Sequence, residues 1–218
     1  MHIPDGFIAP QTYLPAAVLA VGAWAWAARG LRARLDETLV PRLAMLTALA
    51  YGLGLVMLPL PGGTSGHALG VALLALIFGL RLAFLAYSGV LLLQALLFGA
   101  GGITVLPVNA LAMGLVGSAT AITAYKLLKR LHETTAIAVA AWLSVVVPGG
   151  LVALVLGIQP LIAHRPDGTP LFFPFGPQIT LPAVLIPHLF IGIGEAALTV
   201  LVWRYARARK WQGAASRD

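Results

Sequence analysis

Long apolar segments recur along this chain and are separated by short polar or Gly- and Pro-rich stretches. A helix that crosses a lipid bilayer needs roughly 20 residues, with a range of about 17–25. Most of the segments reach this length once flanking residues are included, so the pattern predicts a bundle of membrane-spanning helices. The apolar segments lie at about 13–28, 43–60, 68–80, 83–98, 110–125, 135–162 and 181–203.

Two of these segments allow more than one arrangement. Residues 68–98 contain Arg81 near their middle, so they form either a pair of short helices or one interrupted helix. Residues 135–162 exceed a single straight span, and the VPGG stretch at 147–150 predicts a kink or a break in that helix.

The positions of the basic residues decide the topology, because cytoplasmic loops carry an excess of Lys and Arg. With seven spans and an outside N-terminus, all of the 14 basic residues except Arg165 fall on the inside. They lie within 29–42, at Arg81, within 126–130 and within 204–217. We therefore predict an all-α integral membrane protein, a bundle of about seven transmembrane helices with its N-terminus outside and its C-terminus cytoplasmic. Its expected location is the cell membrane.

Composition supports this class. Hydrophobic residues make up 60% of the chain and charged residues only 10%, whereas soluble domains carry about 25% charged residues. The net charge of +7 is explained by the basic residues of the segments expected on the inside. A nucleic-acid partner is therefore not expected. The absence of cysteine excludes disulfides and zinc–thiolate sites. We expect residues 1–218 to form a single transmembrane domain, with an N-terminal metal-binding segment at 1–12 and a basic cytoplasmic tail at 204–218.

The N-terminal sequence MHIPDGF carries the first candidate chemistry. The first basic residue is Arg29, so the positive region of a cleavable secretory signal is missing and cleavage is not expected. Because His2 is large, removal of Met1 is not expected either. The free amine of Met1, the amide nitrogen between residues 1 and 2 and the imidazole of His2 can then bind one metal ion through fused chelate rings.

A fourth ligand is available on the same predicted face. His67 lies in the Gly-rich loop at 60–70, which shares the outside with the N-terminus. Square-planar nitrogen coordination suits Ni(II) or Cu(II), and Co(II) can be held in the same way, with a poorer fit. The residues therefore predict a site formed by Met1, His2 and His67.

Five further polar residues are considered as candidates because they lie in or beside the predicted spans. Asn109 opens the fifth span and either hydrogen-bonds a ligand histidine or caps the helix. His188 and Glu195 are seven residues apart, on one face of the last helix and about 10 Å apart along its axis. Because ionisable residues within a span usually face the bundle interior, this pair either passes the ion inward or joins helices. His132 and His164 are expected to be surface residues.

A serine protease is the alternative function. GTSG at 63–66 matches the motif of rhomboid intramembrane proteases, with Ser65 as nucleophile and His188 as general base. However, Ser65 follows only two spans, whereas rhomboids place the serine later in the chain. A simpler role for Ser65 and the glycines is to shape the loop that presents His67.

Four stretches together resemble the CbiM/NikM family, the substrate-capture components of energy-coupling-factor cobalt and nickel transporters. They are MHIPDGFIAP, the Gly-rich loop ending in His67, GGITVLPVNALAMG and PHLFIGIGEAALT, and the resemblance runs from residue 1 to about 203. It implies ion binding through Met1, His2 and His67. It also implies ATP-driven import with a transmembrane coupling subunit and two cytoplasmic ATPase subunits, with or without small accessory membrane subunits. The chain has no G-x-x-x-x-G-K-[ST] loop, so we expect a non-catalytic transport subunit.

Overall fold

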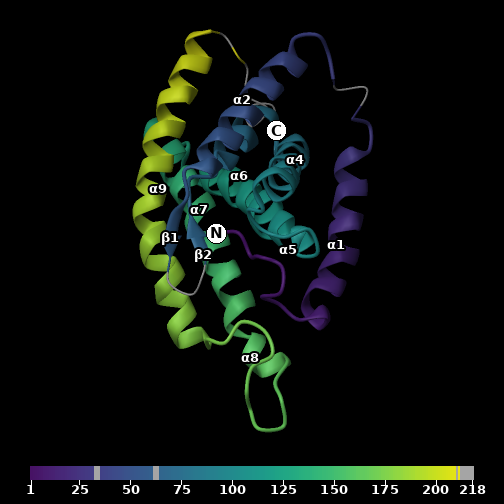
Figure 1. The fold of residues 1–218 in the computed structure, drawn as a ribbon. Coiled ribbons are helices and arrows are strands. Elements are labelled where there is room, and N and C mark those ends of the chain that lie inside the picture. Colours follow the sequence, from purple (N-terminus) through teal and green to yellow (C-terminus); the bar gives the residue numbers. More distant parts are fainter. Residues whose placement is uncertain (32–34, 61–63, 210, 212–218) are drawn as a thin grey trace.

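The computed structural model describes residues 1–31, 35–60, 64–209 and 211. These residues form a helical bundle with one small hairpin (Figure 1). The elements in chain order are α1 (Pro10–Ala28), α2 (Leu39–Leu55), β1 (Leu58–Leu60), β2 (Thr64–Gly66), α3 (Val71–Phe78), α4 (Leu80–Phe98), α5 (Leu106–Asn109), the π-helical segment η1 (Ala110–Val116), α6 (Gly117–Leu128), α7 (Glu133–Gly157), α8 (Gln159–Ile162) and α9 (Pro177–Ala208).

Four helical stretches in the described part of the chain are long and apolar enough to cross a membrane. They are Leu80–Phe98, Leu106–Leu128, Glu133–Ile162 and Pro177–Ala208. Helix α2 is apolar but shorter. Many large hydrophobic side chains lie on the surface, as at Val18 and Phe190, where lipid rather than water is the expected solvent. The prediction of an all-α membrane protein is confirmed.

The segment at 68–98 contains two helices, α3 and α4, which are separated at Gly79. Gly79 has a φ of 81°, a conformation that favours glycine. Helix α3 has eight residues, all of them buried, and is about 12 Å long at 1.5 Å per residue. It is therefore a buried half-helix. Of the two arrangements considered for 68–98, the structure has the pair of helices. Apolar content alone does not distinguish a buried core helix from a helix that faces lipid.

Two other predicted boundaries are corrected. Helix α2 ends at Leu55, and Leu58–Leu60 pairs antiparallel with Thr64–Gly66 instead of extending the helix to residue 60. Pro59 within this stretch disfavours a continued helix, because it lacks an amide donor and restricts the residue before it. By contrast, α7 continues through Pro148, so of the kink or break predicted at 147–150 the break does not occur. Neighbouring helices in a membrane bundle can compensate for the missing hydrogen bond.

Helix α9 packs along α7, beside the site described below (Figure 1). The indole nitrogen of Trp142 in α7 donates a 3.0 Å hydrogen bond to the carbonyl of Leu189 in α9. At Gly149, a Cβ atom would lie 3.4 Å from the His188 ring. The small residue thus lets the two helices approach closely around His188.

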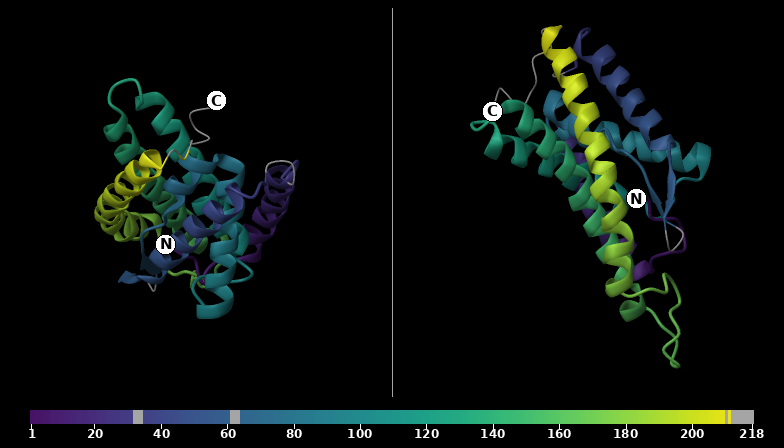
Figure 2. Two further views of the ribbon diagram at one scale, coloured as in Figure 1. Left: turned by 90° about the horizontal axis from the view of Figure 1, so that it is seen from above. Right: turned by 90° about the vertical axis from the view of Figure 1, so that its left-hand side faces the viewer.

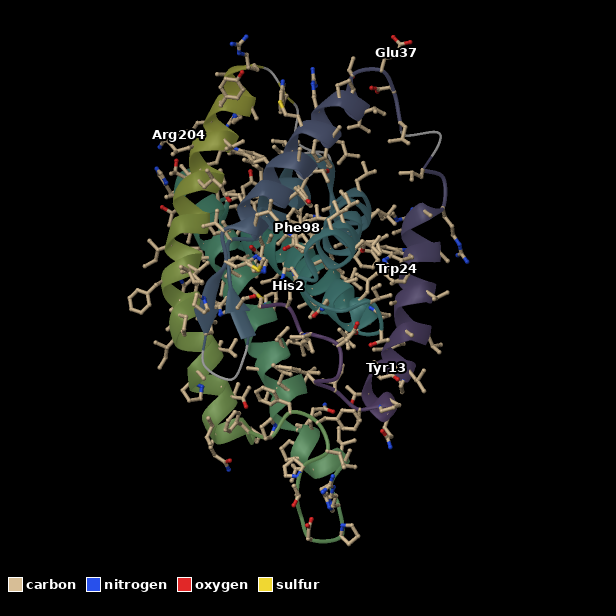
Figure 3. All side chains as sticks on the ribbon, in the orientation of Figure 1. His2, Tyr13, Trp24, Glu37, Phe98 and Arg204 are labelled. Atoms are coloured by element: carbon tan, nitrogen blue, oxygen red, sulfur yellow. The ribbon has the colours of Figure 1, made fainter. Side chains whose placement is uncertain are left out.

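Basic residues from several parts of the chain contact residues of other elements. Arg81 lies over the Trp26 ring, Arg42 lies over the Trp211 ring, and Arg207 forms an ion pair with Glu133. Figure 3 shows Glu37 and Arg204 toward one end of the molecule and Tyr13 toward the opposite end. Of the basic residues used to predict topology, Arg32, Arg34, Lys210 and Arg217 lie outside the described residues, as does most of the predicted tail at 204–218.

The N-terminal segment lies inside the bundle. Figures 1 and 2 place the N-terminus within the outline of the helices, and Met1, Ile3, Ile8 and Ala9 are at most 1% exposed. The first helix begins at Pro10, so the segment predicted at 1–12 comprises residues 1–9. These nine residues are a component of the core and carry His2 into it.

Candidate metal centre

His2 and His67 meet in the interior of the protein. Their rings stack with centroids 4.4 Å apart and planes inclined by 25°, and both side chains are buried. His2 comes from the N-terminal segment, and His67 from the short connection between β2 and α3. Figure 3 shows His2 at the centre of the molecule. The structure therefore brings together the residues that the sequence analysis selected.

The hydrogen bonds of His67 leave one ring nitrogen available as a ligand. Its Nδ1 lies 2.9 Å from the carbonyl oxygen of Ala68. Because a carbonyl only accepts, Nδ1 carries the proton and Nε2 of the neutral ring presents a lone pair. That Nε2 and both ring nitrogens of His2 are buried without a hydrogen-bond partner in the described structure. Buried polar atoms are normally paired, so these nitrogens fit a site that binds a metal ion.

Burial also places the nitrogens in the protonation state that binds metal. It lowers the pKa of the Met1 amine from 8.0 to about 4. Burial, together with the nearby amine, lowers the pKa of His2 from 6.5 to about 3. Burial first, and then the amine and His2, lowers the pKa of His67 well below 6.5. All three groups are neutral near pH 7, as metal coordination requires.

Asn109 holds the N-terminal segment immediately after His2. Its Oδ1 accepts a 3.0 Å hydrogen bond from the backbone N–H of Ile3, and its Nδ2 donates a 3.0 Å bond to the carbonyl of the same residue. Among the described residues, Asn109 bonds no histidine ring and caps no helix with its side chain, so neither of the two roles considered from sequence is seen there. It acts on the backbone that positions His2.

Replacing Asn109 with leucine is expected to weaken Ni(II) binding by about 10–100-fold, the range typical when groups that orient metal ligands are removed. The affinity of the purified variant in a competition assay against a chelator measures this effect. Ser118→Ala is the matched control, because Ser118 is a buried polar residue of the same helical stretch and contacts neither the N-terminal segment nor His67 through a hydrogen bond. Equal losses in the two variants would contradict this role.

Two loops cover the N-terminal segment. From the loop before α5, the backbone N–H groups of Ile103 and Thr104 each donate 3.0 Å bonds to the carboxylate of Asp5. From the loop before α9, the N–H of Phe173 donates a 3.1 Å bond to the carbonyl of Phe7. The rings of Phe7 and Phe173 are also in contact, with centroids 5.7 Å apart.

Gln159 anchors the end of the segment and was not selected from sequence. It is fully buried, and its Oε1 accepts a 2.9 Å bond from the backbone N–H of Ala9. Its Nε2 donates a 2.7 Å bond to the carbonyl of Val155 in α7. The only sequence signal was an amide at the end of a long apolar stretch.

Glu195 joins α9 to the residues that follow His67. Its two carboxylate oxygens accept bonds of 2.8 Å and 2.7 Å from the backbone N–H groups of Leu69 and Gly70. These residues connect His67 to the buried start of α3. Of the two roles considered for Glu195, its contacts are those of a residue that joins helices and fixes the loop that carries His67.

His188 lies beside the same loop. Its Nδ1 is 2.7 Å from the carbonyl of Val184 within α9, and its Nε2 is buried without a hydrogen-bond partner in the described structure. A Cβ atom on Gly66 would lie 3.6 Å from His188 Cε1. His188 is thus a neighbour of the His67 loop, although its ring bonds only its own helix within the described part of the chain.

The serine protease alternative finds no support. Ser65 lies in β2 opposite Pro59, and successive strand residues point to opposite faces. Gly66, the next residue, faces His188, so Ser65 faces away. No hydrogen bond between Ser65 and His188 occurs among the residues that the structure describes. Ser65 belongs to the hairpin that leads directly into His67, the simpler role considered from sequence.

Gln94 in α4 is a second polar neighbour that was not selected from sequence. It is fully buried, and its Nε2 donates a 3.3 Å bond to the carbonyl of Tyr51 in α2. Its side chain also raises the pKa of His2 against the larger effect of burial, although no hydrogen bond joins the two residues in the described structure. Its one sequence signal was an amide within the apolar stretch at 83–98.

Fold and site together define a membrane-embedded helical protein that encloses two histidines and its N-terminal segment beneath packed loops. Comparison with known families identifies the group within this class. The chain belongs to the CbiM family, cobalt uptake substrate-specific transmembrane regions, whose model matches residues 2–212. The family resemblance predicted from sequence is confirmed.

Individual relatives agree with this assignment. The chain is 37% identical over 212 residues to a probable fused nickel transport protein, LarMN, of Lactiplantibacillus plantarum, covering 95% of this chain and 64% of the relative. It is 34% identical over 206 residues to the fused nickel transport protein NikMN of Rhodobacter capsulatus, covering 91% and 59%. It therefore spans less than two thirds of these fused relatives. A crystal structure of a truncated transition metal transporter matches with a TM-score of 0.92 and 34% identity, covering 96% of this chain and 99% of that one.

Proposed function

We propose that this chain captures Ni(II), or alternatively Co(II), at the outer face of the membrane for ATP-driven import. The proposed ligands are the Met1 amine, the amide nitrogen and imidazole of His2, and Nε2 of His67. The observation that carries the proposal is the stacked pair of buried histidines, whose available nitrogens lie without hydrogen-bond partners beside a buried N-terminal amine.

Ligand geometry favours nickel over cobalt. The amine, amide and imidazole of residues 1 and 2 form two fused chelate rings and therefore lie near one plane. His67 completes a square of four nitrogens, an arrangement that suits Ni(II). The names of the two fused relatives, both nickel transport proteins, point the same way.

The test is metal analysis of the protein purified from cells that were given equal nickel and cobalt. Nickel should exceed cobalt in the wild-type protein, and both metals should be lost when His2 and His67 are replaced together. Retention of metal by the double variant would place the site elsewhere. A preparation rich in cobalt would leave the capture role standing and reverse the choice of metal.

Orientation and partners follow from the distribution of charge and from the motifs. The Lys and Arg residues fall mostly in the segments expected on one side of the membrane, which supports an outside location for the N-terminal segment. Since the chain lacks an ATP-binding loop of the P-loop type, partners must supply energy. We propose a transmembrane coupling subunit and two cytoplasmic ATPases as these partners, with or without small accessory membrane subunits. The greater length of the fused relatives leaves room for such a further component.

Metal affinity is expected to fall continuously as the pH decreases from about 8 to 5. The amine and His2 have pKa values of about 4 and 3 when docked, against 8.0 and 6.5 in their ordinary state. Below pH 8, protons therefore bind preferentially to an N-terminal segment that is not packed in the bundle, and so they oppose both its burial and metal binding. The loss of affinity stops growing only when the pH falls below the pKa values of the buried groups, about 4 and 3. Calorimetry at several pH values measures the effect, and a constant affinity between pH 5 and 8 would contradict an amine–imidazole site.

A further inference from the structure

The amide group of Gln94 has a hydrogen bond at its nitrogen and an available acceptor at its oxygen. Its amide group lies 3.3 Å from the carbonyl oxygen of Tyr51. Because a carbonyl only accepts hydrogen bonds, the NH₂ group must face Tyr51, which fixes the orientation of the amide. The oxygen Oε1 therefore points away from Tyr51, and it is buried without a hydrogen-bond partner in the described structure.

The surrounding backbone holds Gln94 against His2. A Cβ atom on Gly54 of α2 would overlap the Gln94 amide, so a glycine makes room for this side chain. The backbone carbonyl of Gln94 accepts a 3.1 Å bond from the N–H of Ala100. In the next residue, Gly101, a Cβ atom would lie 3.4 Å from the Cβ of His2. The turn that follows α4 is thus bonded to the backbone of Gln94 and contacts His2. The two ring nitrogens of His2 also have no hydrogen-bond partner in the described structure.

Metal binding by the proposed ligands determines which ring nitrogen of His2 needs a hydrogen-bond partner. This step therefore rests on the proposed function. When the amide nitrogen of His2 binds the metal, Nδ1 closes a six-membered ring, whereas Nε2 lies on the far side of the imidazole. The proton of the neutral ring is then on Nε2. Histidines that bind metals almost always donate their other N–H to a carbonyl, carboxylate or water. Asn109 is already occupied by Ile3, which leaves Gln94 as the buried acceptor beside His2.

We propose that Oε1 of Gln94 accepts the Nε2–H of His2 in the metal-bound protein. Gln94 is then a positioning residue, which fixes the tautomer and the plane of the His2 ring so that Nδ1 faces the metal. It links α2 and α4 to the site through a chain of hydrogen bonds, from the Tyr51 carbonyl through the amide to the imidazole.

Two variants of Gln94 test this assignment. Gln94→Met keeps the length of the side chain but lacks an acceptor, whereas Gln94→Glu keeps an acceptor oxygen. Gln94→Met should bind Ni(II) about 10–100-fold more weakly than wild type, and Gln94→Glu should recover part of that loss. Thermal unfolding of the metal-free variants controls for a general defect in folding.

The decisive readout is the Nε2 proton of His2. Square-planar Ni(II) is diamagnetic, so this proton can be observed by NMR in histidine-labelled, nickel-loaded protein. It should be protected from exchange with solvent in the wild type and lose protection in Gln94→Met. Unchanged protection and affinity in Gln94→Met would overturn the role of Gln94 alone. Failure of the wild-type protein to bind nickel would overturn the proposed function, and this inference with it.

Discussion

Replacing His67 with alanine is expected to reduce Ni(II) affinity by more than about 100-fold, because loss of a group that only orients a ligand already costs about 10–100-fold. The change removes the one imidazole that completes the square plane and leaves a coordination position open. His67 is buried against His2 with a fixed tautomer. Competition against a chelator of known affinity gives the value.

His164→Ala is the matched control for this experiment. His164 lies on the surface, and its Nδ1 is 3.0 Å from the neighbouring carbonyl of Arg165. It has no contact with the proposed site, so its loss should leave the affinity within about two-fold of wild type, as is usual for surface substitutions within about 0.5 kcal/mol. Similar losses at His67 and His164 would mean that the site has been assigned to the wrong residues.

Adding two residues in front of Met1 is expected to abolish high-affinity binding. The extension turns the Met1 amine into an amide and moves the new amine away from His2. It must also displace Met1, which is fully buried. A two-residue extension is preferable to a single residue. With one added residue, His2 becomes the third residue, and the amine, two amides and the imidazole can form a complete square plane without His67.

The same two residues added after Asp218 provide the control, and they should leave binding unchanged. Size-exclusion profiles and helical content of both proteins should match those of the wild type, because α1–α9 remain available to pack against one another. The proposal requires that the chain in the membrane begins at Met1, which N-terminal sequencing of the purified protein checks. Normal nickel binding by the N-terminally extended, uncleaved protein would rule out the amine as a ligand.

The fold was predictable where local composition determines it. So many residues of the chain are apolar that lipid is the only solvent that suits its surface. The membrane class therefore followed directly from the sequence. The length of α3 did not follow, because eight residues buried by neighbouring helices look the same in sequence as part of a lipid-facing span. The hairpin formed by β1 and β2 was missed for a related reason, since its residues continue the apolar stretch of α2.

The site was predictable as far as its chemistry depends on neighbours in the chain. Met1 and His2 are adjacent, and His67 lies in a loop on the same predicted face. The groups that hold these residues were not predictable, because their partners are distant in sequence. Asn109 bonds Ile3 across 106 residues, Gln159 bonds Ala9 across 150, and Glu195 bonds Leu69 across 126. A single sequence identifies these side chains as polar groups in apolar stretches but does not indicate which backbone they bind.

The coordination of the bound metal tests the central claim most directly. X-ray absorption spectroscopy at the nickel edge, on the full chain loaded with Ni(II), reports both the donor atoms and their geometry. The proposed ligands predict four nitrogen donors in a square plane, a geometry characteristic of Ni(II) with nitrogen ligands, and a diamagnetic ion. A six-coordinate, oxygen-rich and paramagnetic nickel ion would contradict capture by the N-terminal amine, His2 and His67.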